Sequence, residues 1–309
     1  MNAETIIARP RKPWLRRLAE ELFALIVALV LIALVGLIVL DTAPGHRFLV
    51  DRINKIETAT GLRIGVARIE GSIFGKTRLR GVTVADPQGV FATSPEIELD
   101  WAPLAWMYNS LHIERLEADK VRIERLPKLR PSGRTGPILP GFDIEIGKLE
   151  IHRLEVARAV SGRERVGSVS GAATIRAGRA MVDLRFALLD GDRLVVRLDA
   201  EPDGDRFVLD VRAIAPGDGL LAALAGTRRP IDLAIDGTGS WTRWRGRGQL
   251  LLGGRPTGDL ALAADRGRFR LSGTIAPAPF LKGKLQRLTA PRVRVTGAAT
   301  LANRILDGK

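Results

Sequence analysis

The sequence predicts a mainly β protein with a single N-terminal transmembrane helix, a short amphipathic helix and a long antiparallel sheet. Three observations predict this class. One uninterrupted apolar stretch near the N-terminus is long enough to cross a bilayer. From residue 62 onward, apolar and polar residues alternate with a period of two, which is typical of strands with one buried face. Turn residues separate these runs at the spacing of hairpins.

The transmembrane anchor is predicted at residues 15–41, because residues 22–40 read LFALIVALVLIALVGLIVL. About 19 residues at ~1.5 Å rise per residue give roughly 28 Å, close to the hydrocarbon thickness of a bilayer. Five basic residues precede this stretch: Arg9, Arg11, Lys12, Arg16 and Arg17. The positive-inside rule therefore places the tail, residues 1–14, in the cytoplasm and the chain after the anchor across the membrane.

A cleaved signal peptide is the alternative explanation of this apolar stretch. A cleavage site needs small residues at positions −3 and −1. Ala43 suits position −1, but Asp41 is a poor residue at −3 and Pro44 is a poor residue just after the cut. No second apolar stretch of this length follows, so we expect an uncleaved anchor that spans the membrane once.

A short amphipathic helix is predicted next, at residues 44–60. Leu49, Ile53 and Ile56 have the i, i+4, i+7 spacing that places side chains on one helical face. Gly61 is expected to end the helix, because glycine is the preferred residue just after a helix.

The rest of the chain has the alternation of strands. Alternating runs occupy residues 61–127, where IELDW at 97–101 is an example, and they continue through residues 142–309. A Pro- and Gly-rich loop is predicted between these segments, at residues 128–141.

The clearest alternation covers three runs that hairpin-length turns join at residues 190–192 and 202–205. A short helix is predicted after them, at residues 219–225. Alternate residues of a strand point to the same side of its sheet, so we expect the apolar residues of these runs to share one face. They are Val182, Leu184, Phe186, Leu194, Val196, Leu198, Phe207, Leu209 and Val211.

An apolar sheet face of this kind fits two architectures. In a sandwich or a closed barrel, the face packs against a second apolar face and forms a core. In an open, rolled sheet, the face lines a groove. Sandwich cores usually contain aromatic anchors, and aromatic residues make up only 5% of this chain. The alternation alone leaves both architectures open.

Composition and motifs argue against an enzyme, a metal protein and a nucleic-acid-binding protein. The chain has no cysteine and no G-x-S-x-G, H-E-x-x-H or C-x-x-C motif. His46, His112 and His152 lie far apart, without a second ligand at metal spacing. The nearest constellation is His112 with Glu114 and Asp119, of which His112 and Glu114 share one strand face. The net charge is +14, but the basic residues are spread through strands beyond the membrane.

Residues 70–82, EGSIFGKTRLRGV, only superficially resemble a phosphate-binding loop. Three residues separate Gly71 from Gly75, whereas that loop needs four, and the chain continues into a strand pattern instead of a helix. We expect the two glycines to permit a tight bend between strands, with Lys76 solvated.

Four segments carry a family resemblance: GSIFGKTRLRGVTVADPQGVF (71–91), IELDWAPLAW (97–106), LHIERLEADKVRIERLP (111–127) and GTGSWTRWRGRGQL (237–250). In their order, after an anchor and a short helix, they resemble the N-terminal part of the TamB family. These are inner-membrane-anchored proteins of Gram-negative bacteria, related to the AsmA-like group. The resemblance covers essentially the whole chain.

The resemblance implies that the sheet is rolled along its length into an elongated open groove. The groove would carry phospholipids from the inner to the outer membrane, and the nine apolar residues would line it. The resemblance also implies a non-enzymatic protein without catalytic residues, cofactor or metal. The protein would sit in the bacterial inner membrane as a single-pass protein, with its N-terminus cytoplasmic and the remainder periplasmic.

An alternative role implied by the resemblance is a scaffold for outer-membrane biogenesis and protein secretion. Such a scaffold would help to translocate and assemble outer-membrane β-barrel or autotransporter proteins, together with a TamA-like outer-membrane barrel protein. Family members are longer and end in a C-terminal domain that meets this partner. Because residues 142–309 do not match that domain, we expect an N-terminal portion of such a protein or a truncated reading frame.

Overall fold

The computed structural model describes residues 38–55, 57–58, 60–130, 142–201, 204–240, 243–265, 268–276, 292–302 and 305–308. The chain divides into two compact units, residues 1–48 and 49–309. The predicted tail, and all of the predicted anchor except residues 38–41, lie outside the described residues. Within the described ranges, no helix is both long enough and apolar enough to cross a membrane.

The first described helix, α2, covers Ala43–Ile53 and is shorter than the helix predicted at residues 44–60. The side chain of Asn54 explains where it ends. Its amide nitrogen donates to the carbonyl of Val66 at 3.1 Å, and its oxygen accepts from the Val66 N–H at 2.8 Å. Asn54 therefore ties the chain to the start of the sheet instead of continuing the helix.

Among the described residues, sixteen strands form one sheet, which confirms the mainly β prediction. The strands are β1 (Arg63–Gly65), β2 (Arg68–Gly71), β3 (Lys76–Asp86), β4 (Gly89–Ala102), β5 (Ser110–Ile123), β6 (Asp143–Val156), β7 (Arg165–Arg176), β8 (Arg179–Leu188), β9 (Arg193–Glu201), β10 (Arg206–Ala215), β11 (Ile231–Gly239), β12 (Arg243–Leu252), β13 (Arg255–Asp265), β14 (Arg268–Ile275), β15 (Val293–Ala302) and β16 (Ile305–Gly308).

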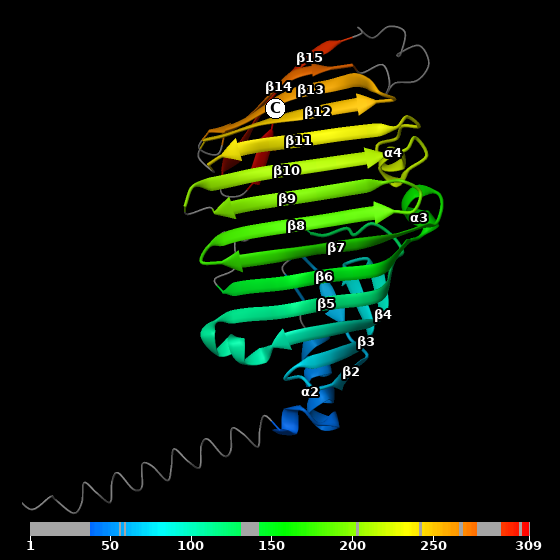
Figure 1. Ribbon diagram of the computed structural model, residues 1–309, viewed down its shortest axis with the longest axis vertical. Helices are drawn as coiled ribbons and strands as arrows, with labels where there is room; N and C mark the ends of the chain where they lie inside the picture. The colour runs from blue at the N-terminus through cyan, green and yellow to red at the C-terminus, as the bar shows by residue number, and fades with distance from the viewer. Residues whose placement is uncertain are drawn as a thin grey trace, which may run out of the picture. The chain divides into compact units, whose positions relative to one another are not determined.

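From β3 to β16, each strand pairs with the next strand in the chain, so the strands lie side by side in the order of the sequence (Figure 1). β1 and β2 both pair with β3. β1 and β16 stand at opposite ends of the strand order and do not pair with each other, so the sheet is not closed. This order excludes a barrel closed through those two strands.

The prediction of an antiparallel sheet is wrong at one place, because β5 and β6 run parallel and the sheet is mixed. Parallel neighbours need a connection that returns the chain to the end at which the first strand began. The segment between Ile123 and Asp143, which contains the predicted loop at residues 128–141, makes that return. Its Pro and Gly content indicated a loop but carried no information about the direction of the next strand.

A buried ion pair between Asp86 and Arg125 holds the first part of the connection between β5 and β6 in place. The side chain of Asp86, which is fully buried, accepts hydrogen bonds from both terminal nitrogens of Arg125, at 2.6 and 2.7 Å. It also accepts from the backbone N–H of Lys128 at 2.6 Å. The guanidinium of Arg125 holds the pKa of Asp86 well below its ordinary value. The turn between β3 and β4 thereby binds the chain that leaves β5.

Two short helices pack at one end of the strands, beside the right-hand edge of the sheet in Figure 1. They are α3 (Arg158–Ser161) and α4 (Leu220–Leu224). The second lies where the sequence predicted a helix at residues 219–225. A third element, the 3-10 helix η1 (Pro103–Tyr108), connects β4 with β5.

Candidate functional site

The register of β8, β9 and β10 places the nine predicted residues on one side of the sheet. Leu184 pairs with Val196, which pairs in turn with Val211. Val182 pairs with Leu198, which pairs with Leu209. Phe186 is opposite Leu194, and Phe207 is opposite Ala200. We call the side that carries these nine residues the apolar face.

The apolar face continues beyond these three strands. Ile235 of β11 is opposite Val211, and Leu233 pairs with Leu250 of β12. On the other side, Val169 of β7 pairs with Phe186, and Ile151 of β6 pairs with Val169. Apolar residues thus face one another across at least seven neighbouring strands.

The nine residues are neither buried nor fully exposed; each is half-buried. β8 and β9 make extended contacts only with their neighbours in the sheet, as far as the described residues go. A residue in the core of a sandwich would be covered by a second layer and nearly inaccessible to water. Among the described elements, none forms such a layer over the middle of these strands.

Helices α3 and α4 cover one end of the apolar face. Leu220 of α4 packs with Leu154, Val156 and Leu188 in a buried cluster, and Phe186 contacts its edge. A second buried cluster joins α4 to the ends of three strands: Ala215, Ala222, Ile231 and Leu252. This end is a packed core of the ordinary kind.

A buried carboxylate holds α4 in place. Asp192 is fully buried and accepts hydrogen bonds from the backbone N–H groups of Leu220 at 2.8 Å and Leu221 at 2.9 Å. These are donors of the first helical turn, which otherwise lack partners. The buried side chain of Arg165 donates to the carbonyl of Asp218 at 2.7 Å, just before the helix. The turn predicted at residues 190–192 therefore also anchors the helical cover.

An aromatic side chain covers the other end of the apolar face. Trp244 of β12 is 8% exposed, and its ring contacts Phe207 edge-on at 5.6 Å between centroids. It lies over two glycines: a Cβ at Gly237 would be 2.0 Å from the indole ring, and a Cβ at Gly246 would be 2.4 Å from it. Glycine is needed at both positions because the ring occupies the space of a side chain.

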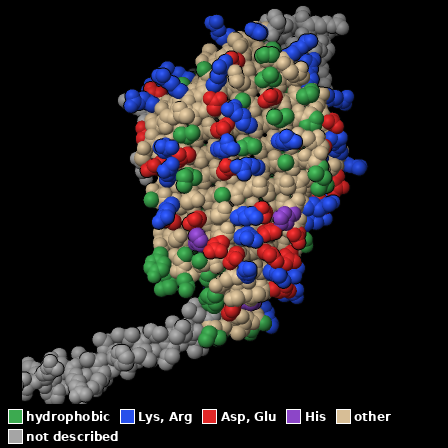
Figure 2. All heavy atoms as spheres, in the orientation of Figure 1, with side chains coloured by type: hydrophobic (Ala, Val, Ile, Leu, Met, Phe, Trp, Pro, Cys, Tyr) green, Lys and Arg blue, Asp and Glu red, His purple; other side chains and the backbone are tan. Residues whose placement is uncertain are grey.

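The opposite side of the sheet is charged, and Figure 2 shows acidic and basic side chains interleaved on the side turned to the viewer. Arg197 lies between Asp183 at 3.4 Å and Asp210 at 3.8 Å. Arg212 continues the row, at 3.3 Å from Asp210 and 3.8 Å from Asp236. Exposed pairs of this kind contribute at most about 1 kcal/mol each, so their main effect is to keep this side solvated.

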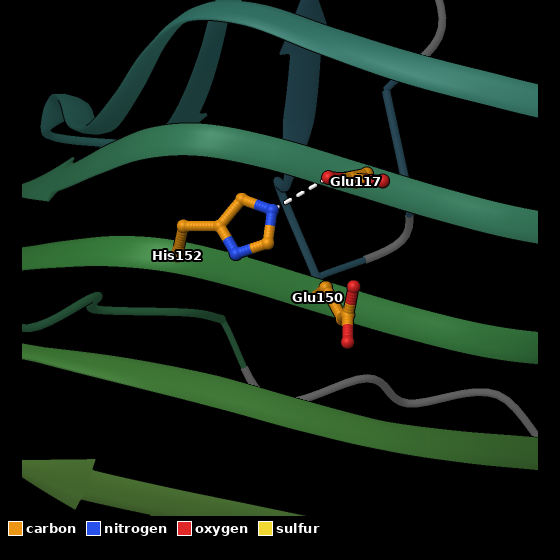
Figure 3. A group of neighbouring side chains, drawn as sticks. All are labelled: Glu117, Glu150 and His152. Carbon is orange, nitrogen blue, oxygen red and sulfur yellow. Dashed lines mark hydrogen bonds and ion pairs between the residues drawn. The ribbon is translucent and has the colours of Figure 1, made fainter.

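Figure 3 shows a group of side chains that the sequence reasoning missed: Glu117 of β5 with Glu150 and His152 of β6. His152 Nε2 lies 2.5 Å from Glu117 Oε1. The hydrogen bond with Glu117 raises the pKa of His152, and the same bond lowers the pKa of Glu117. The Nδ1 atom of His112 lies 3.1 Å from a carboxylate oxygen of Glu145. The hydrogen-bond partner of this histidine is therefore Glu145 and not its sequence neighbour Glu114.

The carboxylate and imidazole groups of this cluster are ligand types for divalent metals. Their charges, however, are already matched by neighbours. Lys148 lies 2.8 Å from Glu150, and Arg115 lies 3.8 Å from Glu117. His152 itself is half-exposed. The arrangement is that of a charged cross-strand network on the solvated side.

The segment that superficially resembles a phosphate-binding loop is a hairpin between β2 and β3. Gly71 has a φ of +84°, and a Cβ there would lie 2.6 Å from the Lys76 carbonyl, so glycine is required. A Cβ at Gly75 would meet open space, so glycine is not needed there. A cavity of about 360 Å³ beside this hairpin is lined by Glu70, Glu98 and Asp100 together with basic residues. Carboxylates in that lining disfavour a phosphate.

Comparison of the chain with protein-family models, with curated proteins and with solved structures gives no match. The resemblance to the TamB family therefore stays a prediction from the quoted segments.

Proposed function

We propose that the chain is a non-enzymatic carrier that holds lipid acyl chains against its apolar face. The observation that carries this proposal is the half-burial of the nine residues in the middle of a sheet that has no second layer among its described elements. Apolar side chains left accessible on this scale usually mark a binding surface. In this proposal the rolled sheet is an open groove, as the family resemblance implies.

The mechanism would be partition between two apolar environments. Each methylene that leaves water contributes about 0.8 kcal/mol, whether it enters a bilayer or the apolar face. Transfer from bilayer to groove is therefore close to balanced, which allows a chain to enter and leave. Small aliphatic side chains such as Val196 and Leu198 form a smooth lining without specific polar contacts. The polar headgroup would stay in water at the open side.

Because the ends of the strands are covered, the accessible middle of the apolar face is better explained as a binding surface than as a sheet that lacks a stable core. Helices α3 and α4 cover one end of the apolar face, and Trp244 covers its other end at β10, β11 and β12. Between these covers, a band of aliphatic side chains runs across neighbouring strands, perpendicular to them. Such a band has the direction that an acyl chain would follow from strand to strand. The proposed route leads from the inner to the outer membrane, with a single-pass anchor in the inner membrane and the remainder in the periplasm.

Photocrosslinking tests the carrier directly. A benzophenone amino acid placed at Leu184, Val196 or Leu209 should form adducts with phospholipid when cells are irradiated. The matched control is Val195, the neighbour of Val196 on the charged side of β9. Adducts at Val195 as strong as those at Val196, or none at the three sites, would contradict the proposal.

A second function, the assembly of outer-membrane β-proteins with a TamA-like partner, has one observation in its favour. The sheet is open, so β1 and β16 are edge strands within the described part of the chain. Edge strands can pair with an incoming strand by β-augmentation. In the crosslinking experiment, protein adducts at the apolar face in place of lipid adducts would favour this role.

A further inference from the structure

The connection between β4 and β5 exposes a compact group of large apolar side chains. In η1, Leu104 is 58% exposed, Trp106 61%, Met107 79% and Tyr108 84%. We call these four residues the η1 patch. Figure 2 shows an apolar area at the lower left, where Figure 1 places this connection. The whole stretch from residue 101 to residue 111 contains no charged residue.

The backbone fixes this patch in an outward orientation. Asn109 adopts the left-handed conformation with φ of 58°, and its N–H donates to the carbonyl of Trp106 at 3.0 Å. The N–H of Asp143 donates to the carbonyl of Asn109 at 3.0 Å, which ties the connection to β6. The ring of Trp106 leans edge-on against Phe142, with centroids 5.7 Å apart. The exposure is therefore built into the fold.

The patch is too small for a stable protein interface. Aromatic side chains offer about 150–250 Å² each. The partly exposed rings of Trp106 and Tyr108, together with the smaller side chains of Leu104 and Met107, therefore present on the order of 500–600 Å². A standard interface buries about 800 Å² on each partner. The four side chains also protrude, whereas residues that dominate protein binding normally fill a pocket. A second copy of the chain would need additional contacts, and charged strands surround the patch.

A lipid bilayer matches these properties better. Its interfacial layer is fluid and can close around protruding groups. Trp and Tyr prefer this depth because each joins an apolar ring to a polar group. Met107 and Leu104 would extend into the region of the acyl chains, as the apolar side of an interfacial helix does. We propose that the η1 patch inserts into the interface of a phospholipid bilayer and holds the first strands of the sheet at the membrane. This inference does not depend on the proposed carrier function.

Site-specific fluorescence can test the insertion, because the chain has no cysteine and one engineered thiol can be labelled alone. The full chain carrying Met107→Cys is labelled with an environment-sensitive nitrobenzoxadiazole dye. It is then reconstituted in vesicles of phosphatidylethanolamine and phosphatidylglycerol with a share of doxyl-labelled lipid. The proximity control is Ala177→Cys, an exposed residue whose N–H donates to Asp143 beside the patch. A distant control is Leu189→Cys, which is 85% exposed at the β8–β9 turn.

We expect the dye at position 107 to be quenched several-fold more strongly than the dye at positions 177 and 189. Adding Leu104→Asp and Tyr108→Asp should reduce the quenching at 107 to the level of the controls. Circular dichroism should show the same strand content, since both side chains are exposed. Equal quenching at 107 and 177 would overturn the proposal. Disulfide crosslinks between two copies of the unlabelled Met107→Cys chain at low protein density, without quenching of the labelled chain, would overturn it as well and indicate a second copy.

Discussion

The covered end of the apolar face and its middle have the same sequence pattern but different surroundings. At the covered end, Leu252 is 1% exposed and packs with Ala222 of α4. In the middle, Leu198 lies on the same face of the same sheet and is half-buried. Both leucines belong to strands that carry polar residues mainly at alternate positions. The alternation therefore indicates which side of a strand is apolar. Whether another element packs on that side depends on parts of the chain that are distant in sequence.

The largest difference in stability is expected between alanine substitutions of a leucine at the covered end and of a leucine in the middle. Leu252→Ala would leave a cavity in a packed cluster, so we expect a loss of about 2–5 kcal/mol in the free energy of unfolding. Leu198→Ala removes a side chain that is partly exposed to water, so we expect a smaller loss of about 1–2 kcal/mol. Urea unfolding followed by circular dichroism measures both. Equal losses would show that the middle is packed like the end.

The strands were largely predictable from the sequence because the period of two is local. The runs at 182–186, 194–198 and 207–211 all lie within strands, and the short turns between them enforce antiparallel pairing. For the helix that covers the apolar face, the sequence predicted its existence but not its packing. A helix at residues 219–225 is visible from composition, but its packing over Leu154 and Leu188 depends on contacts across more than thirty positions of the chain.

Two other features could not be predicted for the same reason. The parallel pairing of β5 and β6 is decided by a long connection, and no local signal gives its direction. That pairing brings Glu117 beside His152, which are on different strands. Only the two-residue spacing of Glu150 and His152 was visible beforehand. The exposure of the η1 patch was also hidden, since apolar residues in a sequence are normally expected inside.

Glycine substitutions should also have different effects beneath Trp244 and away from it. An alanine Cβ at Gly237 would be 2.0 Å from the ring of Trp244, so the indole would have to move. We expect a loss of about 1–3 kcal/mol. Gly248 lies on the same face and is also buried, but Trp244 is not among its nearest neighbours, which would be 3.9 Å from the new Cβ. Gly248→Ala should change stability by about 0.5 kcal/mol or less.

The readout for this pair is the midpoint of urea unfolding together with the fluorescence of Trp244, in chains whose other four tryptophans are replaced by phenylalanine. A shift of fluorescence in Gly237→Ala, without one in Gly248→Ala, would support the cover by the indole. Tolerance of alanine at both positions would contradict it.

We also expect a pH-dependent contribution to stability from the charged side of the sheet, behind the covered end of the apolar face. Glu155 lies between Leu154 and Val156, and hydrogen bonds from Arg153 and then Lys120 lower its pKa from 4.5 to about 2. A carboxylate whose pKa is lowered on folding stabilises the folded state at pH values above its ordinary pKa. This contribution is lost as the pH falls from about 4.5 to about 2.

The variant Glu155→Gln removes the charge and keeps the shape of the side chain. The wild-type chain should be more resistant to urea than the variant at pH 7, and the difference should shrink at pH 3. A difference that is the same at both pH values would rule out the ion pairs as its cause.

We propose that the middle of the apolar face binds lipid and is not a core. To test this, Leu184, Val196 or Leu209 is replaced by aspartate in the full chain, and both unfolding and co-purified phospholipid are measured. Val195→Asp, on the charged side of β9, is the control. We expect the three variants to stay folded with the wild-type strand content and to lose most of the lipid, while the control keeps it. Unfolded variants, or folded variants with undiminished lipid, would contradict it.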